Sequence, residues 1–382
     1  MKRLSHLLVA WLLASALALP AAAEPLRIAA LYNLTGGMSS IDTPGLNGAR
    51  LAAKRINESG GVLGGRMIEV VGIDTETDQR VAAAAAKKAL SEGVVAGVGY
   101  GDTTFVMAAA PLFMERKVPF VTSGATHPEL PAWLGEYFFM VPFGDDDQSF
   151  AIAKYAMDAL GARKVAIWTD EAMDFTTALS RYFKERILAR GGEVVLEDHF
   201  MAGDTDFSAQ VARLRNACPR PDAVFVSAIP NEAGLAVKQI RQAGLALPIV
   251  SGDGFDTELV ATVPGPGLAR DVFFSTHTYR GDTRPMVRDF IRDYHAAYGR
   301  DPENAFAALG YDAVALIANA IERAGSADSA PLREALDATR DFEGVTGKIA
   351  YTRANGVPLK PVAIIGVRGG AYTVERVWLP TR

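Results

Sequence analysis

Short runs of apolar residues alternate along this chain with longer segments in which apolar positions recur every three or four residues. Strand-length runs that are apolar on both faces, separated by amphipathic helices, are typical of parallel sheets covered by helices. The pattern therefore predicts an α/β fold. The strand-like runs lie at Leu26–Leu34, Ile68–Ile73, Val94–Val98, Val118–Val121, Lys164–Trp168, Glu193–Leu196, Ala223–Val226, Pro248–Val250 and Val272–Phe274. The helix-like segments between them lie at Asn47–Asn57, Arg80–Ser91, Phe105–Arg116, Phe150–Leu160, Thr177–Ala189, Phe207–Ala217 and Glu232–Ala243.

The alternating pattern divides into two series. The first series ends and the second begins at the polar stretch Gly144–Gln148. A second irregular stretch, Thr276–Pro285, separates the second series from two further helices at Pro285–Tyr298 and Ala305–Ala324. A length of 382 residues also favours two domains over one. We therefore expect two lobes with a cleft between them, where small ligands commonly bind.

The first 23 residues have the pattern of a secretory signal peptide. Lys2 and Arg3 give a positive start, Leu7–Leu19 is an apolar run, and Ala21–Ala23 supplies the small residues of a cleavage site. The apolar run is shorter than the roughly 20 residues that a membrane span needs. We expect cleavage after Ala23 and an exported, periplasmic protein.

Charge and cysteine content narrow the class of partner. The 39 Lys and Arg residues include Lys2 and Arg3, so the chain from residue 24 carries 37 basic and 44 acidic residues, a net charge of −7. Charges of both signs are interspersed without a basic run, which argues against nucleic acid or a membrane surface as a partner. The single cysteine, Cys218, is expected to be a partly buried small side chain.

Three loops that follow apolar runs have the chemistry of a small-ligand site: Gly99–Thr104, Val121–Thr126 and Ser251–Gly254. In an open parallel sheet, ligands bind at the carboxyl ends of strands, where the free N–H groups of a helix N-terminus favour an anion. The first two loops supply hydroxyl and amide donors suited to a carboxylate, and Thr103 or Thr104 is able to cap the following helix. The third contains Asp253, which we expect to be exposed and to accept from an ammonium group, or else to form only a turn.

Nucleotide binding and enzymatic chemistry find no support in the sequence. The segment Gly97–Gly101 lacks the last glycine of a dinucleotide fingerprint, and no phosphate-binding Gly-x-x-x-x-Gly-Lys-Ser/Thr stretch occurs. The four histidines after residue 23 show no paired metal-ligand spacing, and no nucleophile elbow is present. We therefore expect neither catalysis nor a cofactor or metal.

The loops, in their order along the chain, resemble the periplasmic branched-chain amino-acid-binding proteins, which serve ABC importers. The resemblance covers nearly the whole chain after residue 23 and implies the type I fold, with two doubly wound lobes joined by a hinge of three crossovers. Those crossovers would lie near Gly144, His277 and Lys360, giving lobe 1 residues 24–144 and 278–358, and lobe 2 residues 145–277 and 359–382. The matching segments are Arg27–Leu31, Leu34–Gly36, Gly48–Ala49, Gly60–Gly65, Gly124–Leu130 and Gly310–Val314.

The same resemblance implies a ligand site. Thr103, Thr126 and the backbone at Gly124 or Ala125 would hold an α-carboxylate. Asp253 would take the ammonium group. The aromatic side chains that flank the ligand in the family match Phe175 and Phe306.

Three positions depart from the family pattern. Ile41 and Ile229 stand where the family commonly has aromatic side chains, and the absence of a tyrosine at Ile229 removes one partner for an ammonium. Asp102 lies beside the carboxylate-binding loop, where its charge would repel a ligand anion. Either Asp102 caps the helix, or it helps to bind a ligand that carries an extra donor.

We therefore expect a binding protein that captures a small amino acid, branched-chain or otherwise apolar, and delivers it to ABC importer permease subunits. Contact with the membrane would occur only through the permease. Two alternatives stay open. The ligand is an organic or aromatic carboxylate without an amine, or the chain is the ligand-sensing receptor module of a signalling system.

Overall fold

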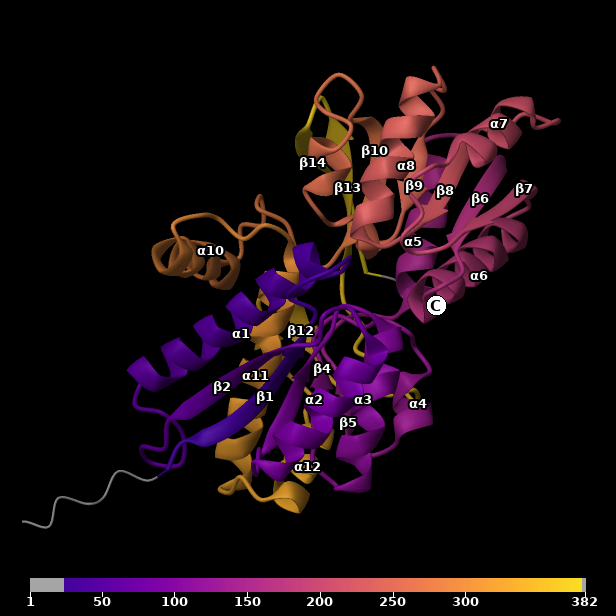
Figure 1. Cartoon of the computed structure of the whole chain (residues 1–382). Helices are drawn as coiled ribbons and strands as arrows, with labels where there is room; N and C mark the ends of the chain where they lie inside the picture. The colour runs from indigo at the N-terminus through magenta and orange to yellow at the C-terminus, as the bar shows by residue number, and fades with distance from the viewer. Residues whose placement is uncertain (1–23, 380–382) are drawn as a thin grey trace, which may run out of the picture.

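The structure is a computed structural model that describes residues 24–379, and the predicted signal peptide lies outside them. The chain forms two α/β bodies, each built on one main sheet (Figure 1). We call lobe 1 the body that contains β1–β5, α1–α4, α10–α12, β11 and β12. Lobe 2 contains β6–β10, β13, β14 and α5–α9.

The main sheet of lobe 1 has five parallel strands in the order β2-β1-β3-β4-β5, and the parallel arrangement confirms the sequence prediction. A small antiparallel pair, β11 and β12, accompanies it. The strands are β1 (Leu26–Tyr32), β2 (Ile68–Asp74), β3 (Ala96–Gly99), β4 (Phe120–Thr122), β5 (Phe138–Met140), β11 (Phe342–Gly344) and β12 (Gly347–Ile349). The helices are α1 (Ser39–Glu58), α2 (Gln79–Ser91), α3 (Thr103–Glu115), α4 (Leu130–Leu134), α10 (Pro285–Tyr298), α11 (Ala305–Ala324) and α12 (Ser329–Asp337).

The sheet of lobe 2 has seven strands in the order β14-β13-β10-β9-β8-β6-β7. Five are parallel, but β13 and β14 run antiparallel at one edge, which the sequence analysis does not predict. The strands are β6 (Lys164–Asp170), β7 (Glu193–Phe200), β8 (Ala223–Ser227), β9 (Ile249–Ser251), β10 (Arg270–Thr276), β13 (Val362–Arg368) and β14 (Ala371–Trp378). The helices are α5 (Asp145–Asp158), α6 (Asp174–Ala189), α7 (Ser208–Asn216), α8 (Pro230–Gln242), α9 (Leu259–Thr262) and the 3₁₀ turn η1 (Asp253–Phe255).

The chain passes between the lobes three times: from β5 to α5, from β10 to α10, and from β12 to β13. The third crossing is bonded to the first. The buried Lys360 of the third crossing donates to the carbonyl of Val141 in the first, at 3.0 Å, and to the Thr346 hydroxyl. The lobe boundaries at residues 144, 277 and 358 stay predictions.

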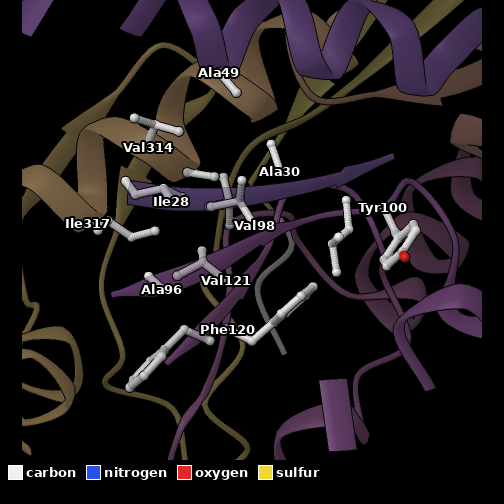
Figure 2. Close-up of a cluster of buried hydrophobic side chains, with 14 of the residues drawn as sticks. Ile28, Ala30, Ala49, Ala96, Val98, Tyr100, Phe120, Val121, Val314 and Ile317 are labelled. Carbon is white, nitrogen blue, oxygen red and sulfur yellow. The ribbon is translucent and has the colours of Figure 1, made fainter. Parts of the chain in front are cut away.

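The core of lobe 1 joins parts of the chain that are distant in sequence. Ile28, Val98 and Val121 lie on neighbouring strands and project from one face of the sheet (Figure 2). On that face they meet Val314 and Ile317 of α11, and all of these side chains are at most 1% exposed. Residues after 300 therefore complete a core that begins near residue 26.

α11 is the one helix among residues 24–379 that is long and apolar enough to cross a membrane, and 78% of its most apolar window is buried in the protein. Its backbone lies against α1. A Cβ atom added at Gly310 would lie 2.0 Å from the carbonyl oxygen of Gly45, and one added at Gly48 would lie 1.7 Å from that of Ala307. The two glycines are therefore required for the contact between these helices.

The expected burial of Cys218 is wrong. The residue is exposed and lies in the loop after α7, just before Pro219. The loop is rich in polar and proline residues and packs no apolar face, so a small apolar side chain finds no core there.

We expect Gly310→Ala to destabilise the protein by about 1–3 kcal/mol, the usual range for overpacking a tight contact. The helix preference of alanine, worth about 1 kcal/mol over glycine, does not relieve a clash with backbone. Urea unfolding followed by circular dichroism measures the change. Gly267→Ala is the matched control, because an added Cβ there meets no atom within 4 Å. Equal stability of the two variants would contradict the steric argument.

Candidate functional site

A narrow, tightly closed pocket lies between the lobes. It contains five side chains that the sequence analysis nominates: Ile41 and Phe306 from lobe 1, and Phe175, Ile229 and Asp253 from lobe 2. Each of the five is at most 4% exposed. Met38, Gly101, Pro230 and Gly254 complete the lining. The structure thus brings together residues from positions 38 to 306 of the chain.

Direct contacts between the lobes surround this pocket. The hydroxyls of Ser40 and Thr257 are 3.1 Å apart, and the backbone N–H of Asp174 donates to the Thr104 hydroxyl at 2.9 Å. On the lobe 2 side, Asp256 Oδ2 accepts from the backbone N–H of Ala305 at 3.0 Å. These bonds hold the lobes in contact, so the pocket is closed.

The first predicted loop joins β3 to α3. The buried Asp42 holds it in place by accepting from the Gly101 N–H at 2.8 Å. The residue that caps α3 is Asp102, whose Oδ1 accepts from the Thr104 N–H at 2.6 Å. Thr103 and Thr104 therefore lie inside the first turn and do not cap it. The Thr103 hydroxyl is fully buried and has no hydrogen-bond partner in the described part of the chain.

The second predicted loop follows β4. The N–H of Gly124 donates to the Tyr100 carbonyl at 3.0 Å, and that of Ala125 donates to the Thr122 hydroxyl at 3.1 Å. The Thr126 hydroxyl donates to Asp145 Oδ1 at 2.7 Å. These three donors of the loop are thus used within the protein, and their contact with a ligand carboxylate stays a prediction.

The third predicted loop follows β9 and carries Asp253. The expectation that this residue is exposed is wrong, because it is 2% exposed in the pocket wall. Its Oδ1 accepts from Gln148 Nε2 at 3.0 Å, and Gln148 Oε1 accepts in turn from the Asp253 N–H at 3.0 Å. Its Oδ2 lies 2.9 Å from Nε2 of His277. The carboxylate is therefore fixed in orientation.

Gln148, Asp145 and His277 belong to the site, and the sequence analysis does not nominate them. Gln148 Nε2 also donates to Asp145 Oδ1, at 2.8 Å, so one amide joins two buried carboxylates. The imidazole of His277 stacks on Phe143, with ring centroids 3.7 Å apart. Asp145 and Gln148 lie three residues apart on one face of α5. That spacing, in the polar stretch Gly144–Gln148, could have marked Asp145 and Gln148 as polar residues on one helix face, but not their contact with Asp253.

Burial changes the acidity of the carboxyl groups around the pocket. Desolvation raises the pKa of Asp42 and of Asp102 to about 7 in each case, partly offset by the backbone N–H groups that each carboxyl accepts. Desolvation also raises the pKa of Asp145, to about 8, and the nearby charge of Asp253 adds to the effect. Burial therefore favours the uncharged form of these three carboxyl groups. Among residues 24–379, no group of three or more His, Cys, Asp or Glu side chains is placed to hold a metal ion.

Two mainly parallel α/β lobes, joined by three crossings and closed over an apolar pocket, define a ligand-binding protein of the type I fold. The chain belongs to the periplasmic binding protein family, whose model matches residues 25–371. The family is non-enzymatic, and its members of this kind are the solute-binding proteins of ABC transporters.

Several relatives extend over nearly the full chain. The leucine-, isoleucine-, valine-, threonine- and alanine-binding protein of Pseudomonas aeruginosa is 27% identical over 92% of each chain. Among solved structures, a leucine-binding protein from Thermotoga maritima is 34% identical with a TM-score of 0.86, over 93% of this chain and 99% of that one. A branched-chain amino acid transporter substrate-binding protein from Streptococcus pneumoniae, in complex with isoleucine, is 31% identical with the same TM-score and coverage.

Likeness of fold extends to proteins with other ligands. A solute-binding protein from R. palustris, in complex with benzoate, is 21% identical with a TM-score of 0.83, over 93% of this chain and 97% of that one. This comparison shows a common fold alone. The identity of the ligand must therefore be argued from the pocket.

We expect the free energy of unfolding of the ligand-free protein to fall as the pH rises from 7 to 8. Asp42, Asp102 and Asp145 have folded pKa values of about 7 to 8, above the ordinary 3.8, so the folded state keeps protons that the unfolded state has released. The depressed pKa values of His127 and His277 act below pH 6.5, and that of Lys360 acts above pH 8. Urea unfolding at three pH values measures the slope.

The Asp145→Asn variant is the comparison for this slope. Its amide has no proton to release, so the loss of stability between pH 7 and 8 should be smaller than in the unaltered protein. A slope that is flat or of opposite sign in the unaltered protein would contradict the raised pKa values.

Proposed function

We propose that this protein captures a small amino acid, branched-chain or otherwise mainly apolar, between its lobes in the periplasm and delivers it to the permease of an ABC importer. The observation that carries the proposal is a single acid, Asp253, held rigidly in the wall of an otherwise apolar pocket. A ligand with one ammonium group and an aliphatic body matches that wall.

The ammonium end of the ligand would contact Asp253. An ionised carboxylate offers about four acceptor sites, and the two oxygens of Asp253 each have one partner, so further donors are accommodated. The described pocket lining contains no Lys or Arg that would compete for the carboxylate. Burial strengthens a charge-assisted bond of this kind because water is excluded.

The carboxylate end of the ligand would lie at the start of α3. The Thr103 hydroxyl is buried there beside Gly101, which lines the pocket. The first N–H groups of a helix have no partner inside the helix, and the helix dipole favours an anion at that end. Thr126 would join this site if its hydroxyl turned away from Asp145 when a ligand binds.

The body of the ligand would lie against the apolar walls. Met38, Ile41 and Phe306 come from lobe 1, and Phe175 and Ile229 come from lobe 2. A ligand in this position touches both lobes and so stabilises the closed arrangement over an open one. Closure would bring together a surface from both lobes that a permease is able to distinguish from the open form.

We expect amino acids, but not the matching acids without an amine, to raise the thermal stability of protein from residue 24 onward. The protein is first unfolded and refolded to remove any bound ligand. A ligand at 100 times its dissociation constant adds about 2.7 kcal/mol to the free energy of unfolding, which a thermal-shift assay detects readily. Leucine with isocaproate is one matched pair. Stabilisation by the deaminated acids alone would contradict the proposal and favour an organic or aromatic carboxylate as the ligand.

Asp253→Asn should weaken the binding of the preferred amino acid by about 10- to 100-fold, because a hydrogen bond to a charged group contributes about 1.5–3 kcal/mol. Isothermal titration calorimetry measures the affinity. Asp289→Asn on the exposed face of α10 is the matched control, since its side chain is 60% exposed and remote from the pocket lining. Unchanged affinity in Asp253→Asn would exclude the ammonium contact.

A further inference from the structure

Asp102 uses only one of its two carboxylate oxygens. Oδ1 accepts from the Thr104 N–H and caps α3. Oδ2 is buried, and no hydrogen-bond partner for it occurs among residues 24–379. No Lys, Arg or His of the described residues forms an ion pair with this carboxylate. Helix capping therefore accounts for Oδ1 of Asp102 and does not account for Oδ2.

The Asp102 carboxyl lies on the side of lobe 1 that meets lobe 2. The next residue but one, Thr104, accepts from the Asp174 N–H of lobe 2, and the preceding residue, Gly101, lines the pocket. The negative charges of Asp174 and Asp170 in lobe 2 contribute to the raised pKa of the Asp102 carboxyl. The charge of Asp102 in turn contributes to the raised pKa of Asp145. Asp102 thus lies between a residue that lines the pocket and a residue that contacts lobe 2.

Helix capping alone does not require a carboxylate at this position. Serine, asparagine and threonine cap helices about as well, and none brings a charge. A buried carboxyl oxygen without a hydrogen-bond partner destabilises the protein, and a donor that reaches it offsets that cost. The neighbouring Thr103 hydroxyl is also buried without a partner in the described chain. This turn therefore contains two buried polar atoms, Asp102 Oδ2 and Thr103 Oγ1, to which a ligand could bond.

We propose that the ligand carries a second nitrogen-borne donor group, an ammonium or an amide, which donates to Asp102 Oδ2. The ligand class is then a small amino acid whose side chain ends in nitrogen, with its carbon skeleton against the apolar walls and its α-ammonium at Asp253. This inference rests on the proposed function and adds a requirement on the side chain. Asp102 would disfavour a purely aliphatic ligand relative to a donor-bearing one by leaving its own carboxyl oxygen unpaired.

Matched pairs of amino acids test the requirement. Leucine and asparagine have side chains of similar shape, and so do norleucine and ornithine, but only asparagine and ornithine carry a side-chain donor. Isothermal titration calorimetry on refolded protein is expected to show at least about tenfold tighter binding of the donor-bearing member in one pair, as for a hydrogen bond to a charged group.

Asp102→Asn is the decisive variant, because asparagine retains the cap of α3. The preference within the pair should fall at least about tenfold, while the affinity for the aliphatic member stays within about threefold. Asp78→Asn is the matched control. Asp78 caps α2 in the same way, accepting from the N–H groups of Arg80 and Val81, and it does not line the pocket. Equal melting temperatures of the two variants confirm that both fold.

The outcomes separate this inference from the proposed function. Binding of leucine or norleucine without preference for the donor-bearing partner, or a preference that survives Asp102→Asn, would overturn the inference and leave the amino-acid function standing. Binding of 1,5-diaminopentane but of no amino acid, lost in Asp102→Asn, would support the role of Asp102 and overturn the amino-acid function. Binding of deaminated acids alone would overturn both.

Discussion

The two lobes meet around buried carboxyl groups, and two of these, Asp145 and Asp253, are held by donors from other parts of the chain. Gln148 joins Asp145 to Asp253, His277 holds the far oxygen of Asp253, and Thr126 reaches Asp145 from the other lobe. A buried acid needs such partners, because desolvation otherwise disfavours its charged form. The ligand pocket and the hinge are consequently parts of one network: His277 lies where the chain returns to lobe 1, and Asp145 lies where it first leaves.

Most of the fold follows from the hydrophobic pattern. β1, β3, β4 and β8 are continuous buried runs flanked by amphipathic helices, and a run buried on both faces between helices has few alternatives to a central parallel strand. Two of the strands that the sequence analysis does not predict lack that signal, whereas β13 carries it and is not nominated. β5 has only three residues. β14 is largely exposed at an antiparallel edge, so its sequence shows no alternation of buried and exposed positions.

Some residues of the site also follow from the sequence, and others do not. Asp253 and the loop of Asp102 follow buried strands at the carboxyl edge of a sheet, so position alone marks them as candidates. Phe175, Ile229 and Phe306 meet only after the chain has crossed between lobes, and the family resemblance places them in the pocket where periodicity does not. Gln148 and His277 are the hardest of these residues to predict from the sequence. Their role depends on the distance to Asp253, and no local pattern encodes a contact between residues more than a hundred positions apart, as Gln148 and Asp253 are.

The contact between α1 and α11 has a consequence for how the chain acquires its structure. β1, β3 and β4 are made first, yet the helix that covers one face of them begins at Ala305, after all the parallel strands of lobe 2. Contacts of such long range form late, because the intervening chain must first be brought together. Lobe 1 therefore stays incomplete while most of lobe 2 emerges. The apolar face of the first sheet therefore stays uncovered until α11 has been made.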